Sequence, residues 1–85
     1  MKKNRRIRHE AQVAEMKAAL ARSLGKRRRR LGLTQARLAK LLGTSQSRLS
    51  RIEADDPGVS LELLVRALLA AGATRREIGR VVAGP

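Results

Sequence analysis

The stretch from Thr34 to Glu53 reads TQARLAKLLGTSQSRLSRIE and decides the fold. Two short segments with the apolar spacing of helices lie on either side of Gly43. Ala39 has only a methyl side chain where two crossed helices would come closest, and Gly43 stands where the first helix must end with positive φ. The side chains predicted to pack between the two helices are Leu38, Leu42, Leu49 and Ile52. The stretch therefore predicts two tightly crossed helices joined by a short turn.

The second helix of this pair has a polar face whose chemistry suits DNA. A helix-turn-helix crosses two helices in this way and places the second in the major groove. At about 100° per residue, Leu49 and Ile52 fall on one side and the polar residues on the other. Arginine matches the paired acceptors of guanine, and glutamine matches adenine, whereas an ordinary solvated helix would more often carry Glu and Lys. The residues predicted to reach base edges are Gln46, Ser47, Arg48, Ser50 and Arg51, with Arg48 at either a base or a phosphate.

Four motifs extend this pattern over more than half of the chain. They are GLTQ (32–35), LAKLLGTSQ (38–46), LSRIE (49–53) and SLELL (60–64). Through them, the sequence from Leu24 to about Leu69 resembles the lambda repressor/Cro-like family, also called XRE-type helix-turn-helix domains. The resemblance implies an all-α, compact bundle of about five helices, usually acting as a dimeric repressor in bacteria or phages. One departure is Arg27, where many members carry an apolar residue.

The resemblance also implies roles for individual residues. Gln35 matches the position that hydrogen-bonds a phosphate. Arg28 and Glu53 match an ion pair between the first helix and the end of the recognition helix. Thr44 and the N–H groups near Ser60 should lie near the same DNA strand, because exposed helix starts attract anions.

The charge of the chain is large and unevenly distributed. The formal net charge is +13, and residues 1–30 hold twelve Lys or Arg, whereas residues 54–85 are neutral. This asymmetry suits a DNA face and a protein-contact face. The chain has no Phe, Tyr or Trp, which argues against single-strand binding, and no Cys, which excludes disulfides and thiolate metal sites. No nucleophile or phosphate-loop motif is present, so we expect no enzyme, no cofactor and no metal. No apolar run suits a membrane, and we expect a cytoplasmic, nucleoid-associated protein.

Outside the central stretch, the sequence predicts a basic flexible arm and a domain over residues 11–83. Residues 1–10 form the arm, in which Arg5 and Arg6 would contact phosphates; a merely solvated tail fits equally well. A first helix is expected over residues 11–31, with an apolar stripe and a bend or break near Gly25. Ser60 should cap a fourth helix, and Thr74 with Glu77 should form the capping box of a fifth. The apolar stripe of the first helix comprises Val13, Met16, Leu20, Leu24 and Leu31.

Three functions fit these patterns. The first is a sequence-specific, double-stranded DNA-binding transcription regulator, a repressor that binds a palindromic operator as a homodimer. Its dimer surface would be the neutral end from Leu68 through the fifth helix, where Val81 and Val82 need not face the same core. The second is the antitoxin of a toxin–antitoxin pair, which holds a protein toxin and represses its own operon. The third is a coactivator bridge between a regulator and the transcription machinery.

Overall fold

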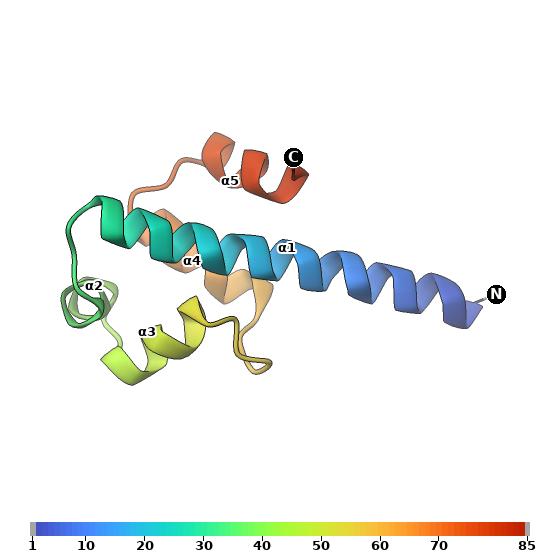
Figure 1. Ribbon diagram of the computed structural model, residues 1–85, viewed down its shortest axis with the longest axis horizontal. Helices are drawn as coiled ribbons and strands as arrows, with labels where there is room; N and C mark the ends of the chain where they lie inside the picture. Colours follow the sequence, from blue (N-terminus) through green and yellow to red (C-terminus); the bar gives the residue numbers. More distant parts are fainter. Residues whose placement is uncertain (1, 85) are drawn as a thin grey trace.

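The computed structural model describes the backbone of residues 2–84 and the side chains of residues 9–84. Figure 1 shows α1 running the length of the molecule, with α5 on one side and α2 and α3 on the other. The elements are α1 (Lys2–Arg30), α2 (Gln35–Leu42), α3 (Gln46–Glu53), α4 (Leu61–Ala70) and α5 (Arg75–Ala83). Since this part of the chain holds five helices and no strand, the predicted all-α fold is confirmed.

Each of the four short helices begins at a hydroxyl residue that closes its first turn. In every case the hydroxyl oxygen accepts a hydrogen bond from the backbone N–H three residues later, at 3.0–3.1 Å. The four caps are Thr34, Ser45, Ser60 and Thr74. The backbone N–H of Thr74 in turn donates to Oε1 of Glu77 at 3.0 Å, which completes the predicted capping box. Gly43 ends α2 with φ 70°, the left-handed conformation that favours glycine.

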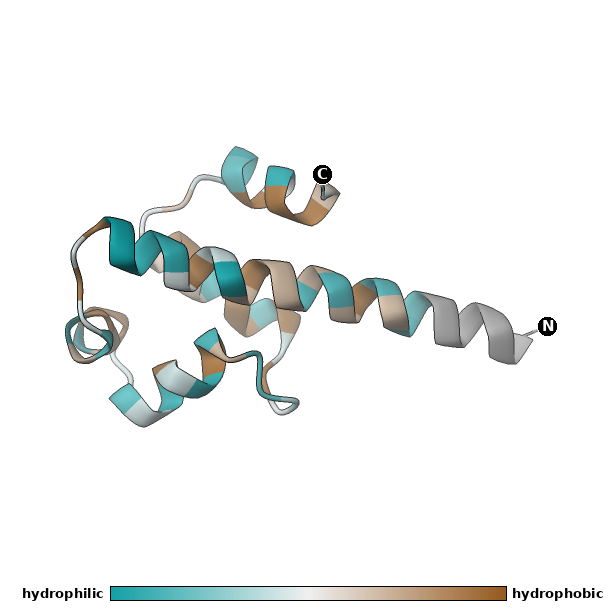
Figure 2. Ribbon diagram, viewed as in Figure 1, coloured by the Kyte–Doolittle hydropathy of each residue, from teal (hydrophilic) through white to brown (hydrophobic). Residues whose placement is uncertain are grey.

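The core is aliphatic and surrounds the second half of α1. Helices α3, α4 and α5 all pack against α1, and the apolar faces of the helices turn toward one another (Figure 2). The largest fully buried side chains are Leu20, Leu24, Leu38, Leu49, Leu64 and Leu68. Ile78 joins them from α5. Because each buried leucine contributes about 1.5–3 kcal/mol, these residues fix the relative positions of the helices without any aromatic side chain.

The first helix differs from its prediction at both ends. It begins at Lys2, so the predicted boundary at Ala11 was wrong, and residues 2–10, predicted as an arm, are helical. The physical reason is that residues 2–24 contain neither Gly nor Pro and are rich in Lys, Arg, Glu and Ala, which favour helix. Leu31 lies beyond the helix and is 54% exposed, so it does not continue the core stripe.

The helix also continues through Gly25, so the predicted break is absent. Gly25 is buried, and a Cβ atom built on it would lie 3.6 Å from Oε1 of Glu53, at the end of α3. The nearest atom, Nη1 of Arg29 at 3.2 Å, ends a flexible side chain, and 3.6 Å is an ordinary contact distance, so the space beside α3 does not itself require glycine. Toward its N-terminus, α1 projects beyond the bundle (Figure 1), and Val13 there is 41% exposed.

Candidate nucleic-acid interface

Small and apolar side chains hold α2 and α3 together. Ala39 is 2% exposed on α2, and Leu49 and Ile52 are 0% and 2% exposed on α3. All three belong to the single core cluster. After Gly43 the backbone N–H of Thr44 bonds back to the carbonyl of Ala39 at 2.9 Å, which fixes the turn between the helices. With one face of α3 buried in this way, its opposite face is turned outward.

That outward face carries the polar residues singled out in the sequence. The exposed side chains of α3 are Gln46, Ser47, Arg48, Ser50 and Arg51. No carboxylate within the described side chains pairs with Arg48 or Arg51. Both guanidinium groups therefore keep their donors available for guanine edges or phosphates.

Three of the predicted DNA contacts gather where α3 meets α4. Thr44 and Arg48 line one hollow there, and Arg48 and Ser60 line another. Arg48 thus lies between two helix starts whose free N–H groups suit anions. Arg66 of α4 lines both hollows and was not singled out in the sequence. It pairs with Glu62, one turn earlier on α4, at 3.2 Å, and this i,i+4 spacing is that of an ordinary solvated pair, which carries no signal for DNA.

Glu53, at the end of α3, is held by two other elements. Nε of Arg28 donates to Oε2 of Glu53 at 2.7 Å, and Nη2 donates to Oε1 at 3.1 Å. The same guanidinium donates through Nη1 to the carbonyl of Leu33 at 2.9 Å. Side-chain exposures of 13% for Arg28 and 9% for Glu53 show that the pair is nearly buried. This pair joins the end of α3 to α1 and to the loop before α2.

Gln35 belongs to the same cluster. Its Nε2 donates to Oε1 of Glu53 at 3.1 Å, and its side chain is half-buried at the start of α2. An amide nitrogen has two N–H donors, so one remains for a phosphate. The contact with Glu53 would hold that second donor in a fixed direction.

The predicted contacts of Arg5 and Arg6 lie outside the described side chains, which begin at His9. Arg27, the departure from the family pattern, pairs with Glu77 on α5 and joins α1 to α5. The spacing of apolar residues could not predict this contact, because it links two charged residues that are fifty positions apart in the sequence. None of the helices in the described part of the chain is both long and apolar enough to cross a membrane.

A helix-turn-helix with a polar outward face on its second helix, set in an all-α bundle, defines a class of DNA-binding domain. The model of the helix-turn-helix family HTH_3 matches residues 19–78, which is more than half of the chain. The chain belongs to this family and is a DNA-binding transcription regulator. The lambda repressor/Cro-like resemblance is thereby confirmed. A comparison with curated proteins and with solved structures gives no match.

Proposed function

We propose that this regulator is a repressor that recognises one double-stranded DNA sequence through the outward face of α3. The proposal rests on the exposure and the unpaired donors of the two arginines of α3. Arg48 and Arg51 are exposed, and neither pairs with a carboxylate in the described part of the chain, while Leu49 between them is fully buried and holds the helix in place. A rigid helix with free guanidinium groups suits contacts with base edges and with phosphates.

The exposed residues divide by position into base and phosphate contacts. Gln46, Ser47, Ser50 and Arg51 would reach base edges. Arg48 would take a phosphate, because it lies beside Thr44 and Ser60 at the helix starts. Gln35 would bind a phosphate through its second N–H. The phosphate contacts would supply most of the affinity, and the base contacts the specificity.

The regulator would bind as a homodimer on a two-fold operator. One short recognition helix makes few base contacts, and two helices about 34 Å apart read successive major grooves on one face of DNA. Ile78 is buried within the bundle and Val81 is half-buried. Leu69 on α4, 46% exposed, and Val82 near the end of α5, 38% exposed, remain as apolar side chains that a second copy would cover. Because two side chains bury little area, self-association in free solution should be weak to moderate and should strengthen on DNA.

Selection of bound duplexes from a random pool tests the proposal. We expect a pseudo-palindromic consensus, and on that duplex Arg51→Ala should lose about 1–3 kcal/mol of discrimination at one base pair in each half-site. Equal weakening on every duplex would show that α3 does not read bases there. Sedimentation with the selected duplex should give two chains per duplex. One chain per duplex at saturation on a verified symmetric site would refute the dimer.

The alternative function, an antitoxin, is favoured by the projecting part of α1. The family match begins at residue 19, while α1 begins at Lys2 and leaves Val13 exposed. A toxin could dock on this additional surface. If a neighbouring reading frame encodes a toxin, co-expression of this chain should relieve growth arrest, and Val13→Glu should abolish the relief while operator binding stays unchanged. Relief that survives the substitution would place the toxin elsewhere, and no relief would reject the antitoxin.

A further inference from the structure

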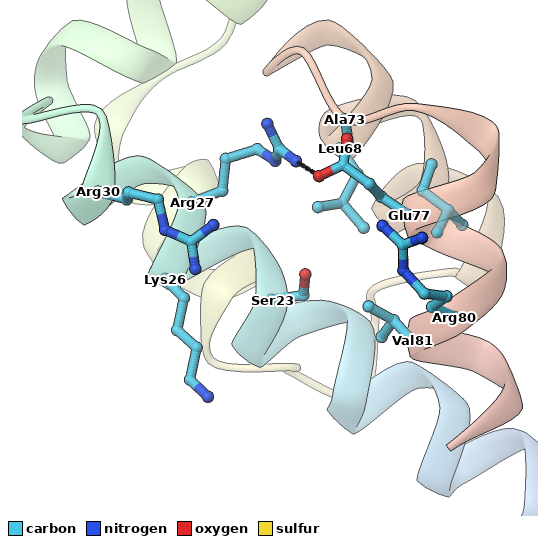
Figure 3. Close-up of a pocket in the computed structure, with 10 residues that line it drawn as sticks. Ser23, Lys26, Arg27, Arg30, Leu68, Ala73, Glu77, Arg80 and Val81 are labelled. Atoms are coloured by element: carbon cyan, nitrogen blue, oxygen red, sulfur yellow. Dashed lines mark hydrogen bonds and ion pairs between the residues drawn. The ribbon is translucent and has the colours of Figure 1, made fainter. Parts of the chain in front are cut away.

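A groove between α1 and α5 lies on the side of α1 away from α3 (Figures 1 and 3). It encloses about 280 Å³. Its apolar lining consists of the half-buried Val81 and the buried side chains of Leu68 and Ile78, so Val81 supplies most of the apolar surface that a ligand could reach. Arg27 and Glu77 pair at one end and cancel each other's charge (Figure 3). The groove thus combines a small apolar floor with a charged rim, and within the described residues no further element lines it.

The rim of the groove is strongly basic. Lys26 and Arg30 from α1 and Arg80 from α5 line it, and all three side chains are exposed. Figure 3 shows Arg80 turned toward the space between the two helices. None of the carboxylates in the described part of the chain pairs with them. Three positive charges therefore remain unmatched around an apolar floor. None of the three residues lies on α3 or lines the hollows beside it.

We propose that this groove binds an acidic segment of a partner protein. An apolar side chain of the segment would lie against Val81, and carboxylates on either side of it would pair with Lys26, Arg30 and Arg80. Arginine and carboxylate form strong bidentate pairs, and apolar contact on the floor adds affinity that a phosphate backbone cannot gain. The combination of an apolar floor and a basic rim favours an amphipathic acidic peptide over nucleic acid.

The position of the groove gives the interaction a use. Because α1 separates it from α3 (Figure 1), a partner in the groove would not cover the outward face of α3. The regulator could hold DNA and an acidic protein at the same time. This inference does not depend on repression or on a dimer, and it can be tested on the protein without DNA.

The test uses a fluorescein-labelled helical peptide in which one Leu is flanked by Glu in the preceding and following turns. Its control has the same composition with the Glu residues spread around the helix. In about 0.15 M salt, where charges are screened beyond about 8 Å, anisotropy should show binding of the first peptide only. Lys26→Glu and Arg80→Glu should each weaken it about tenfold or more. Arg76→Glu is the control, because it changes the net charge equally at an exposed position of α5 outside the groove. It should change the affinity for the peptide by less than about twofold.

Amide chemical shifts should move at Ser23, Ala73 and Val81, and not along α3. Equal binding of the control peptide, or equal weakening by Arg76→Glu, would reduce the effect to general charge attraction and overturn the proposal. A short duplex that displaces the peptide and shifts the same amides would make the groove a second DNA surface and would also overturn it. Far-ultraviolet circular dichroism checks that the variants fold, and Arg80→Gln replaces any variant that does not.

Discussion

Replacing Arg28 by Met would leave the carboxylate of Glu53 nearly buried with one remaining donor, the amide of Gln35. The wild-type side chain of Arg28 donates twice to Glu53 and once to the carbonyl of Leu33, at 2.7–3.1 Å. Removing one partner of a buried ion pair costs about 3–5 kcal/mol, and an exposed pair contributes about 0–1 kcal/mol. Since the two side chains keep 13% and 9% exposure, we expect a loss of about 2–3 kcal/mol.

That loss is large for a chain of 85 residues, whose total stability is on the order of 4–13 kcal/mol. It corresponds to a fall in Tm of about 10–20 °C. Urea unfolding followed by circular dichroism suits a chain without tryptophan. A double-mutant cycle with Glu53→Gln should give a coupling energy of about 1–2 kcal/mol.

The pair of Arg66 and Glu62 is the matched control, since its side chains are 73% and 75% exposed. The same cycle on this pair should give a coupling energy of about 0.5 kcal/mol or less. If the coupling of Arg28 with Glu53 is no larger than that of the control, the pair does not hold α3 to α1, and the reasoning from burial is wrong.

Three further predictions concern a DNA contact, a turn and a helix cap. Gln35→Ala should weaken operator and random duplexes alike, by about tenfold at most, and a changed consensus in a binding selection would contradict the phosphate role. Gly43→Ala should cost about 1 kcal/mol in urea unfolding because φ is 70°, whereas Gly79→Ala, inside α5 with nothing within 4 Å of an added Cβ, should stabilise by a similar amount. The pKa of Glu77 lies below its ordinary value of 4.5. The largest cause is the hydrogen bond from the backbone N–H of Thr74, and the side chain of Thr74 and the positive charge of Arg27 lower the pKa further. The ionised form is therefore favoured by folding, so its contribution to stability is present above pH 4.5 and is lost as the pH falls through the lowered pKa. Glu77→Gln should therefore flatten the dependence of the free energy of unfolding on pH in this range. An unchanged dependence would show that the ionised carboxylate of Glu77 does not stabilise the fold.

The helix starts and the turn between α2 and α3 were predictable because their causes are local. A hydroxyl residue such as Thr34 closes the turn that follows it, and Gly43 supplies a backbone conformation, whatever the rest of the fold does. The apolar spacing of Leu49 and Ile52 likewise fixes which face of α3 turns outward. The predicted helix-turn-helix depended only on such short-range patterns.

The differences arose where distant residues or competing local rules decide the outcome. The charge of the Lys- and Arg-rich N-terminal segment predicts a solvated arm. The same residues have a high helix propensity, however, and the segment is part of α1. Nothing in the spacing of Arg27 and Glu77 indicates that they meet, because α4 and its turns must first bring α5 back to α1. The groove beside them exists only because α5 packs against α1. Its rim combines residues of both helices, so it could not be predicted from residues that are close in the sequence.

Arg27 and Arg28 are consecutive residues, and one binds α5 while the other binds the end of α3. Because α1 is unbroken, their directions differ by a fixed angle of about 100°. A single residue inserted between Leu24 and Arg27 would rotate both guanidinium groups away from their partners at once. An insertion ahead of Val13 would only lengthen the part of α1 that lies beyond the bundle. Insertions and deletions should therefore be tolerated ahead of Val13. They should destabilise the fold in the helical turn of Arg27 and Arg28, because this turn binds both α5 and the end of α3.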